Sequence, residues 1–181
     1  MPATRYTHPA IALHWLMAVL LTGLFGLGLY MSEMALSPEK LKLYSWHKWA
    51  GVSAFLLVLL RIAWRAGHPP PALPAAMPRW QQAASHALHH LLYLSMVAIP
   101  LSGWLMSSAK GFQTVYFGVL PLPDLLAKDK ALGELLETVH ATLNYTLAVL
   151  VVAHVAAALK HHLLDRDDVL SRMLPWAQRS R

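Results

Sequence analysis

The sequence predicts an all-α integral membrane protein, an antiparallel bundle of four transmembrane helices. The 181 residues are 56% hydrophobic and only 13% charged, whereas soluble domains carry about 25% charged residues. The apolar residues gather in four runs, at about 10–31, 44–64, 85–108 and 138–160. Each run is long enough to cross the hydrocarbon of a bilayer as a helix. Only short connections remain, so we expect residues 1–181 to form a single domain.

The first run has no small-residue cleavage site after a short apolar core, so we interpret it as a retained helix rather than a signal peptide. It contains Gly23, Gly26 and Gly28. Their spacing does not match a phosphate-binding loop. Small residues in a membrane helix instead admit a neighbouring helix or a flat macrocycle.

The second run follows an expected connection at 32–46 and has His47 near its start. Gly51, one turn later, is expected to bare the helix surface beside that imidazole. The run closes with Arg61 and Arg65, and the proline-rich stretch HPPPALPAAMP after it cannot remain helical.

The third run follows an expected interfacial turn that holds His86, His89 and His90, and Pro100 is expected to kink it. The connection at 109–137 is too polar to span. We expect it to lie on the surface, with a short amphipathic helix at about 129–137.

The fourth run carries His140 and His154, fourteen residues apart. At about 100° per residue, fourteen residues fall close to four full turns, so both imidazoles share a helix face about 21 Å apart along the axis. Same-face histidines near opposite sides of a membrane indicate two stacked cofactors. The alternative is that each is an interhelical hydrogen-bonding group, although ionisable groups at such depth are costly and are usually functional.

The expected depth in the membrane matches His140 and His154 with two other histidines. His14, near the start of the first run, can share a level with His154, and His47 can share the opposite level with His140. Two imidazoles on opposing helices suit a six-coordinate haem iron, whereas zinc needs three or four converging ligands. The chain has no cysteine, which excludes Cys-ligated iron–sulfur clusters and covalent c-type haem. A haem-free metal or proton transporter is the alternative of another class.

The distribution of cations predicts the orientation. All eight arginines lie in the N-terminal lead, the second connection, the tail and the adjoining helix ends, and the opposite side balances six lysines against six acids. The positive-inside rule therefore places both termini in the cytoplasm. It also explains the net charge of +6 better than nucleic-acid binding does.

Several stretches resemble the bacterial cytochrome b561 family of four-helix, dihaem b membrane proteins. They are RYTHPAIALHWLMA with His14, YSWHKWAGV with His47, and ETVHATLNYTLAVLVVAHVAAALKHH with His140 and His154. The HPPP loop is shared but less specific. The resemblance covers nearly the entire chain.

This resemblance implies two non-covalent haems b in a bacterial inner membrane and electron exchange with quinone. One branch of the family oxidises superoxide on the periplasmic side and reduces ubiquinone, and its fourth helix ends with a histidine that His161 matches. By that likeness the chain is a superoxide:quinone oxidoreductase-like enzyme. The alternative is a quinol-linked cytochrome b subunit that exchanges electrons with a separate redox partner.

The remaining polar residues give secondary candidates. Imidazole titrates near neutrality, so His161 can protonate quinone or can be an interfacial, solvated histidine. Candidates for the quinone pocket are His86, His89 and Arg79, with interface anchoring as the alternative for the two histidines. Candidates for contacts with haem propionates are Arg61, Arg65 and Lys160, with topology and snorkelling as their alternative.

Overall fold

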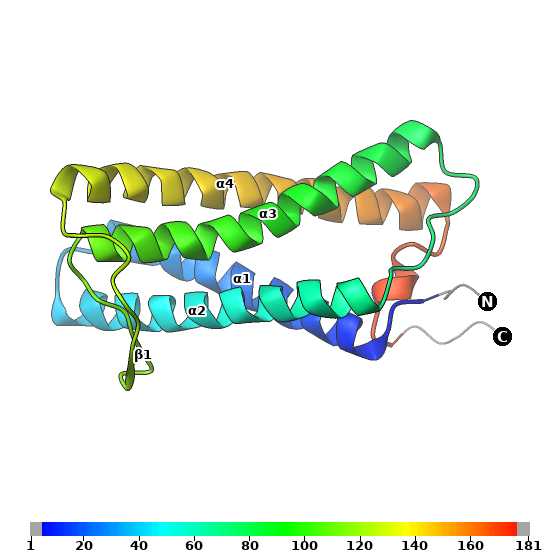
Figure 1. Cartoon of the computed structure of the whole chain (residues 1–181). Coiled ribbons are helices and arrows are strands. Elements are labelled where there is room, and N and C mark those ends of the chain that lie inside the picture. The colour runs from blue at the N-terminus through cyan, green and yellow to red at the C-terminus, as the bar shows by residue number, and fades with distance from the viewer. Residues whose placement is uncertain (1–4, 177–181) are drawn as a thin grey trace.

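The computed structural model describes residues 5–176 and consists chiefly of four long helices lying side by side (Figure 1). They are α1 His8–Glu33, α2 Pro38–Gly67, α3 Arg79–Ala109 and α4 Lys130–Lys160. By length and composition all four can cross a membrane. The predicted fold class, an all-α transmembrane bundle, is confirmed.

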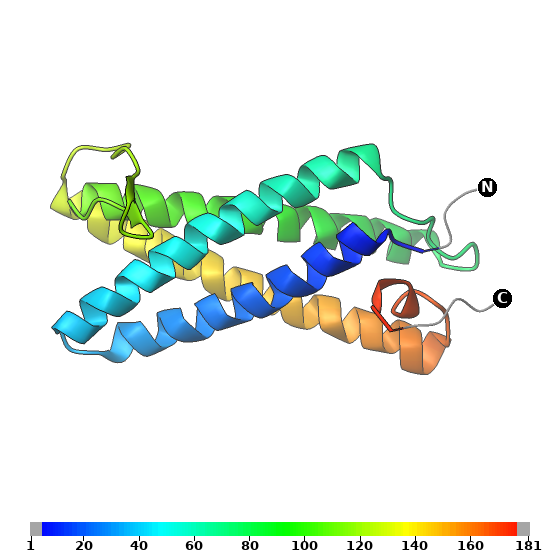
Figure 2. The same ribbon diagram turned by 90° about the horizontal axis from the view of Figure 1, so that it is seen from below.

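The helices form two pairs, α1 with α2 and α3 with α4, and α2 packs against α3 to join them. Figure 2 shows how the helices of the bundle cross at an angle when it is viewed from below. Between 6% and 28% of each apolar window is buried inside the protein, so most of its apolar surface is available to lipid. Gly133 of α4 lies beside the end of α3. A Cβ on Gly133 would lie 2.9 Å from Lys110 Cγ and 3.5 Å from the Lys110 backbone nitrogen, so a larger residue there would require the Lys110 side chain to move.

The helices α2 and α4 begin earlier in the sequence than we expected. The Ser37 hydroxyl accepts a hydrogen bond from the Lys40 backbone N–H, and Pro38 occupies the first helical turn, so α2 begins well inside the expected connection at 32–46. Asp129 caps α4 in the same way. The expected amphipathic helix at 129–137 is therefore not separate, because it continues into the fourth span without a break.

The start of α3 corrects a third expectation. His86, His89 and His90 lie within α3 rather than in an interfacial turn before it. Pro100 lies inside the same helix, where it cannot donate a hydrogen bond to the carbonyl four residues earlier. Figure 1 shows α3 changing direction along its length, the effect expected of an internal proline.

At one end of the bundle a small hairpin follows α3, and we call this the hairpin end (Figure 1). Strand β1, Val115–Tyr116, pairs with β2, Leu120–Pro121, across a turn at Gly118, whose φ is +72°. The Trp49 indole N–H donates to the Val115 carbonyl at 2.6 Å, which fixes the hairpin against α2.

The first and last segments of the described chain lie at the opposite end of the bundle, which we call the terminal end (Figure 1). Here α4 passes into a π-helical turn, η1 His161–Asp165, and a 3-10 turn, η2 Ser171–Met173, follows. The Trp15 indole donates to the Met173 carbonyl at 2.9 Å, and Arg172 donates to the Ala72 carbonyl at 2.6 Å. The tail is thereby held against both α1 and the proline-rich connection.

Reporter fusions will test which end faces the cytoplasm. We expect alkaline phosphatase, which is active only in the periplasm, to be active when fused after Asp124 at the hairpin end. Fusions after Pro74 or at the C-terminus are expected to be silent, because the arginines concentrate at the terminal end. An active C-terminal fusion would reverse the orientation.

Candidate functional site

Two imidazoles from helices that do not pack closely on each other meet towards the terminal end. The rings of His14 on α1 and His154 on α4 have centroids 6.1 Å apart and planes tilted by 60°. A metal ion with bonds of about 2 Å to one nitrogen of each ring would hold the centroids roughly 6 Å apart. This pair therefore fits two axial ligands of a haem iron.

Side chains from the other two helices surround this pair. The His89 ring of α3 lies edge-on to His154, with centroids 5.2 Å apart, and its Nδ1–H donates to the Ser85 carbonyl at 2.7 Å. Arg61 of α2 has Nη2 3.2 Å from His14 Nδ1 and donates through Nε to the Tyr93 hydroxyl at 2.9 Å. All four helices thus contribute a side chain to this level of the bundle.

A second cation extends the same polar region. The Arg65 guanidinium lies over the Tyr93 ring at 5.7 Å, and both line a small cavity with Arg61 and Tyr6. Burial raises the pKa of the Tyr6 phenol against the opposing effect of Arg65, so this phenol remains neutral. The two arginines can accept anionic groups such as haem propionates.

The second histidine pair lies towards the hairpin end. His140 on α4 directs Nδ1–H to the Ile99 carbonyl at 3.1 Å and to the Ser102 hydroxyl at 2.9 Å. A backbone acceptor of this kind fixes the tautomer and leaves Nε2 free to bind a metal. His140 is thus oriented as a metal ligand.

His47 on α2 lies within electrostatic range of His140. Its Nδ1 is buried and has no hydrogen-bond partner in the described part of the chain. Buried polar atoms are nearly always paired, and a metal bond would give this ring a partner. The residues of this pair, like those of the first, fit an iron held by two imidazoles.

Two glycines allow helix backbones to come close to this pair. A Cβ added to Gly103 of α3 would lie 3.1 Å from His140 Cε1, and one on Gly28 of α1 would lie 3.5 Å from His47 Cε1. A Cβ on Gly51, Gly23 or Gly26 would meet nothing within 4 Å. The glycine that adjoins the His47 ring is therefore Gly28 on the neighbouring helix. Neither Gly103 nor Ser102 was a sequence candidate, because pairing α3 with α4 required the tertiary structure.

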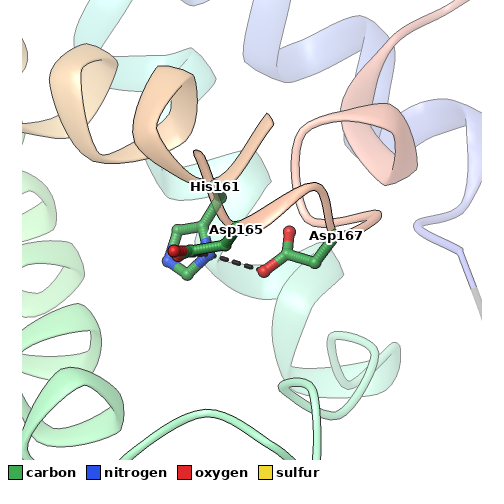
Figure 3. Close-up of side chains that lie close together, drawn as sticks. All are labelled: His161, Asp165 and Asp167. Atoms are coloured by element: carbon green, nitrogen blue, oxygen red, sulfur yellow. Dashed lines mark hydrogen bonds and ion pairs between the residues drawn. The ribbon is translucent and has the colours of Figure 1, made fainter. Parts of the chain in front are cut away.

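His161 lies at the end of α4 among carboxylates (Figure 3). Its Nδ1 lies 2.6 Å from Asp167 Oδ2 and 3.1 Å from Asp165 Oδ2. Lys160 pairs with Asp165 at 2.6 Å, and its contact with a haem propionate stays a prediction. Neither aspartate is a site candidate from the sequence, because only the reversal of the chain after α4 brings the DRDD stretch back to His161.

The candidate quinone-pocket residues differ in exposure. His89 is half-buried against His154, whereas His86 and Arg79 are exposed. His89 therefore lies beside the first histidine pair, and the assignment of these three residues to a quinone pocket stays a prediction.

Comparison with known proteins places the chain in a family. Residues 5–176 match the profile of the prokaryotic cytochrome b561 family. The chain is 38% identical over 178 residues to cytochrome b561 homolog 2 of Escherichia coli (strain K12), covering 94% of this chain and 91% of that protein. It is 29% identical over 182 residues to cytochrome b561 homolog 1 of the same organism, covering 94% and 97%.

A third relative is the probable superoxide oxidase CybB of Yersinia pestis, 27% identical over 177 residues, which cover 94% of this chain and 96% of that protein. The chain belongs to the prokaryotic cytochrome b561 family. It is a multi-pass b-type cytochrome of the bacterial inner membrane and functions in electron transfer. The family resemblance seen in the sequence is thereby confirmed.

Substitution of the four histidines will test the ligand assignment. We expect His14→Ala and His154→Ala to lose the same haem, and His47→Ala and His140→Ala to lose the other, because each pair faces across one level of the bundle. Pyridine haemochrome assays and redox-resolved spectra of the purified variants measure this. Loss of different haems in His14→Ala and His154→Ala would contradict the pairing.

The close approach at Gly103 gives a separate prediction. Gly103→Ala should displace the His140 ring by a few tenths of an ångström, because a Cβ 3.1 Å from His140 Cε1 is tighter than nine in ten real Cβ contacts. We expect a shifted potential or partial loss of the haem at the hairpin end, measured by redox titration. Gly67→Ala is the matched control, since a Cβ there meets nothing within 4 Å. Equal spectra and potentials in the two variants would contradict the prediction.

Proposed function

We propose that this protein transfers electrons across the membrane from superoxide on the periplasmic side to ubiquinone. Two haems b, one held by His47 and His140 and one by His14 and His154, are its proposed cofactors. The observation that carries the proposal is the pair of same-face histidines on α4, each with an imidazole partner on another helix. Haem iron supplies a one-electron carrier whose potential is set by its axial ligands and surroundings.

The residues of the chain hold these sites at different depths in the bilayer. Because His140 and His154 lie on one continuous helix, their separation of about 21 Å is maintained by the backbone itself. Ser102 and the Ile99 carbonyl orient the His140 ring through its Nδ1–H. Around the His14–His154 pair, Arg61 and Arg65 supply positive charge, which suits the two propionate carboxylates of a haem.

The hairpin end carries positive charge that suits a small anionic electron donor. The Lys48 ammonium, next to His47 in the sequence, donates to the Phe112 carbonyl at 2.9 Å. Among the described residues it forms no ion pair within 4.0 Å, and the Asp124 carboxylate acts on it only from a longer distance. We therefore propose that its charge attracts an anion. The name of the Yersinia pestis relative, a probable superoxide oxidase, supports superoxide as that donor.

The terminal end is proposed to hold the quinone. Two superoxide ions, one quinone and two protons give two molecules of oxygen and one quinol, so protons must be taken up where the quinone is reduced. His161 lies at this end with a side chain that is 13% exposed. It can therefore meet a lipid-soluble quinone and still exchange protons with the cytoplasm.

Stopped-flow absorbance tests both half-reactions. Superoxide mixed with the oxidised protein in lipid nanodiscs should reduce the haems, and ubiquinone should then reoxidise them. If a quinol reduces the haems but superoxide does not, the protein is a quinol-linked subunit of a larger electron-transfer system.

His161→Ala should preserve both haem spectra, because His161 is not one of the four proposed ligands. Haem reduction by superoxide should persist while reoxidation by ubiquinone slows, up to the roughly 10²–10⁴-fold contribution of a general acid. His162→Ala is the matched control, since His162 is the exposed neighbour. Equal reoxidation rates in the two variants would remove His161 from the quinone site.

A further inference from the structure

The turn that ends α4 brings two carboxylates back to His161. Arg166 adopts a left-handed conformation with φ of 53°, which reverses the chain after η1. The backbone N–H of Asp167 then donates to the His161 carbonyl at 3.1 Å. Non-glycine residues rarely adopt this conformation, so the reversal is a specific feature of the turn.

Asp167 is held at both oxygens of its carboxylate. Oδ2 accepts from His161 Nδ1–H at 2.6 Å, and Oδ1 accepts from the Val169 backbone N–H at 3.0 Å. The second bond, to a backbone N–H two residues on, is the Asx type of turn and fixes the carboxylate in place. The side chains of His161 and Asp167 are 13% and 20% exposed, so water screens this short contact less than it screens a surface ion pair.

Asp165 is engaged differently. Its Oδ2 lies 3.1 Å from His161 Nδ1 but 2.6 Å from the Lys160 ammonium. The carboxylate is therefore shared with a cation, and its contact with the imidazole is the longer of the two. His161, Asp165 and Asp167 bring three ligand-type atoms together, and one of the two carboxylates is already paired with the Lys160 ammonium.

The geometry points to Asp167 as the positioning residue for proton delivery by His161, an inference that rests on the proposed quinone site. With Nδ1–H donated to Asp167, the proton that His161 exchanges is the one on Nε2. Nε2 lies on the far side of the ring from Asp167 (Figure 3) and has no hydrogen-bond partner among the described residues. It is therefore free to face a ligand.

The imidazolium gives its Nε2 proton to a reduced quinone oxygen, the N–H bond breaks and an O–H bond forms. His161 remains as a neutral ring that still donates Nδ1–H to Asp167, and Nε2 then takes a proton from cytoplasmic water. The electrons are those of the proposed superoxide oxidation. The Asp167 carboxylate changes no bond, and it selects the tautomer and stabilises the positive charge on the ring.

Reoxidation of the reduced, haem-loaded protein by ubiquinone-1 in nanodiscs tests the inference. Asp167→Asn should slow the reaction by roughly 10- to 100-fold, as when an orienting charge-assisted hydrogen bond is lost, without changing the quinone concentration at half-maximal rate. The solvent deuterium isotope effect should rise, because proton delivery becomes rate-limiting. Asp165→Asn should slow it less, and Asp167→Glu, which retains the carboxylate, should recover part of the rate.

Asp168→Asn is the matched control. Asp168 lies in the same turn but pairs with Arg172, and its side chain is 58% exposed, so the rate should not change. If Asp167→Asn matches Asp168→Asn while His161→Ala is slow, the inference is wrong and the proposed function stands. If His161→Ala is also unchanged, the quinone site itself is wrong.

A second measurement avoids dependence on the folding of one variant. Nitrogen-15 NMR of the histidine-labelled protein, with the His161 signals assigned by their loss in His161→Ala, should show the neutral ring protonated at Nδ1. A neutral ring protonated at Nε2 would overturn the inference, because Nδ1 would then have no proton to donate to Asp167.

Discussion

The four imidazoles proposed to bind haem, those of His14, His47, His140 and His154, lie inside the membrane-spanning helices, where an unpartnered polar group has no water to bind. Each one therefore needs a polar partner inside the bundle. For His140 the Ile99 carbonyl and the Ser102 hydroxyl satisfy one ring nitrogen, and the other nitrogen is the one proposed to bind iron. His47 Nδ1 has no such partner among the described residues, which agrees with the proposal that this ring binds a metal. Much of the architecture follows from satisfying these rings.

Helix packing is arranged around the same need. The close pairs are α1 with α2 and α3 with α4, yet His14 and His154 belong to α1 and α4. The rings thus link helices whose backbones do not pack closely on each other. Where a backbone does approach a ring, a glycine is present, as Gly103 is beside His140. A larger residue at such a position would force the imidazole to move, because its side chain would meet the ring. Small residues also help membrane helices to associate closely.

The two ends of the bundle differ in chemistry. At the hairpin end, Trp49 and Lys48 donate to backbone carbonyls of the connection after α3, which orders a polar segment at the membrane surface. At the terminal end, a π-helical turn and a left-handed Arg166 change the direction of the chain, and Arg172 attaches the tail to the second connection. The electron donor and the electron acceptor of a transmembrane cytochrome can therefore meet surfaces of different character.

The sequence by itself determined the fold class and the expected levels of His14, His47, His140 and His154. Runs of about twenty apolar residues can satisfy their backbone in lipid only as helices, and the fourteen-residue spacing of His140 and His154 determines their shared face whatever surrounds them. It did not determine the start of α2 or α4, because Ser37 and Asp129 act as caps only once the chain turns into them. Tertiary structure alone decided that His89 contacts His154, that Gly103 adjoins His140, and that Asp167 returns to His161. The physical reason is that helical periodicity is a local property, whereas contacts between helices and across a reversed turn depend on how separate segments pack in three dimensions.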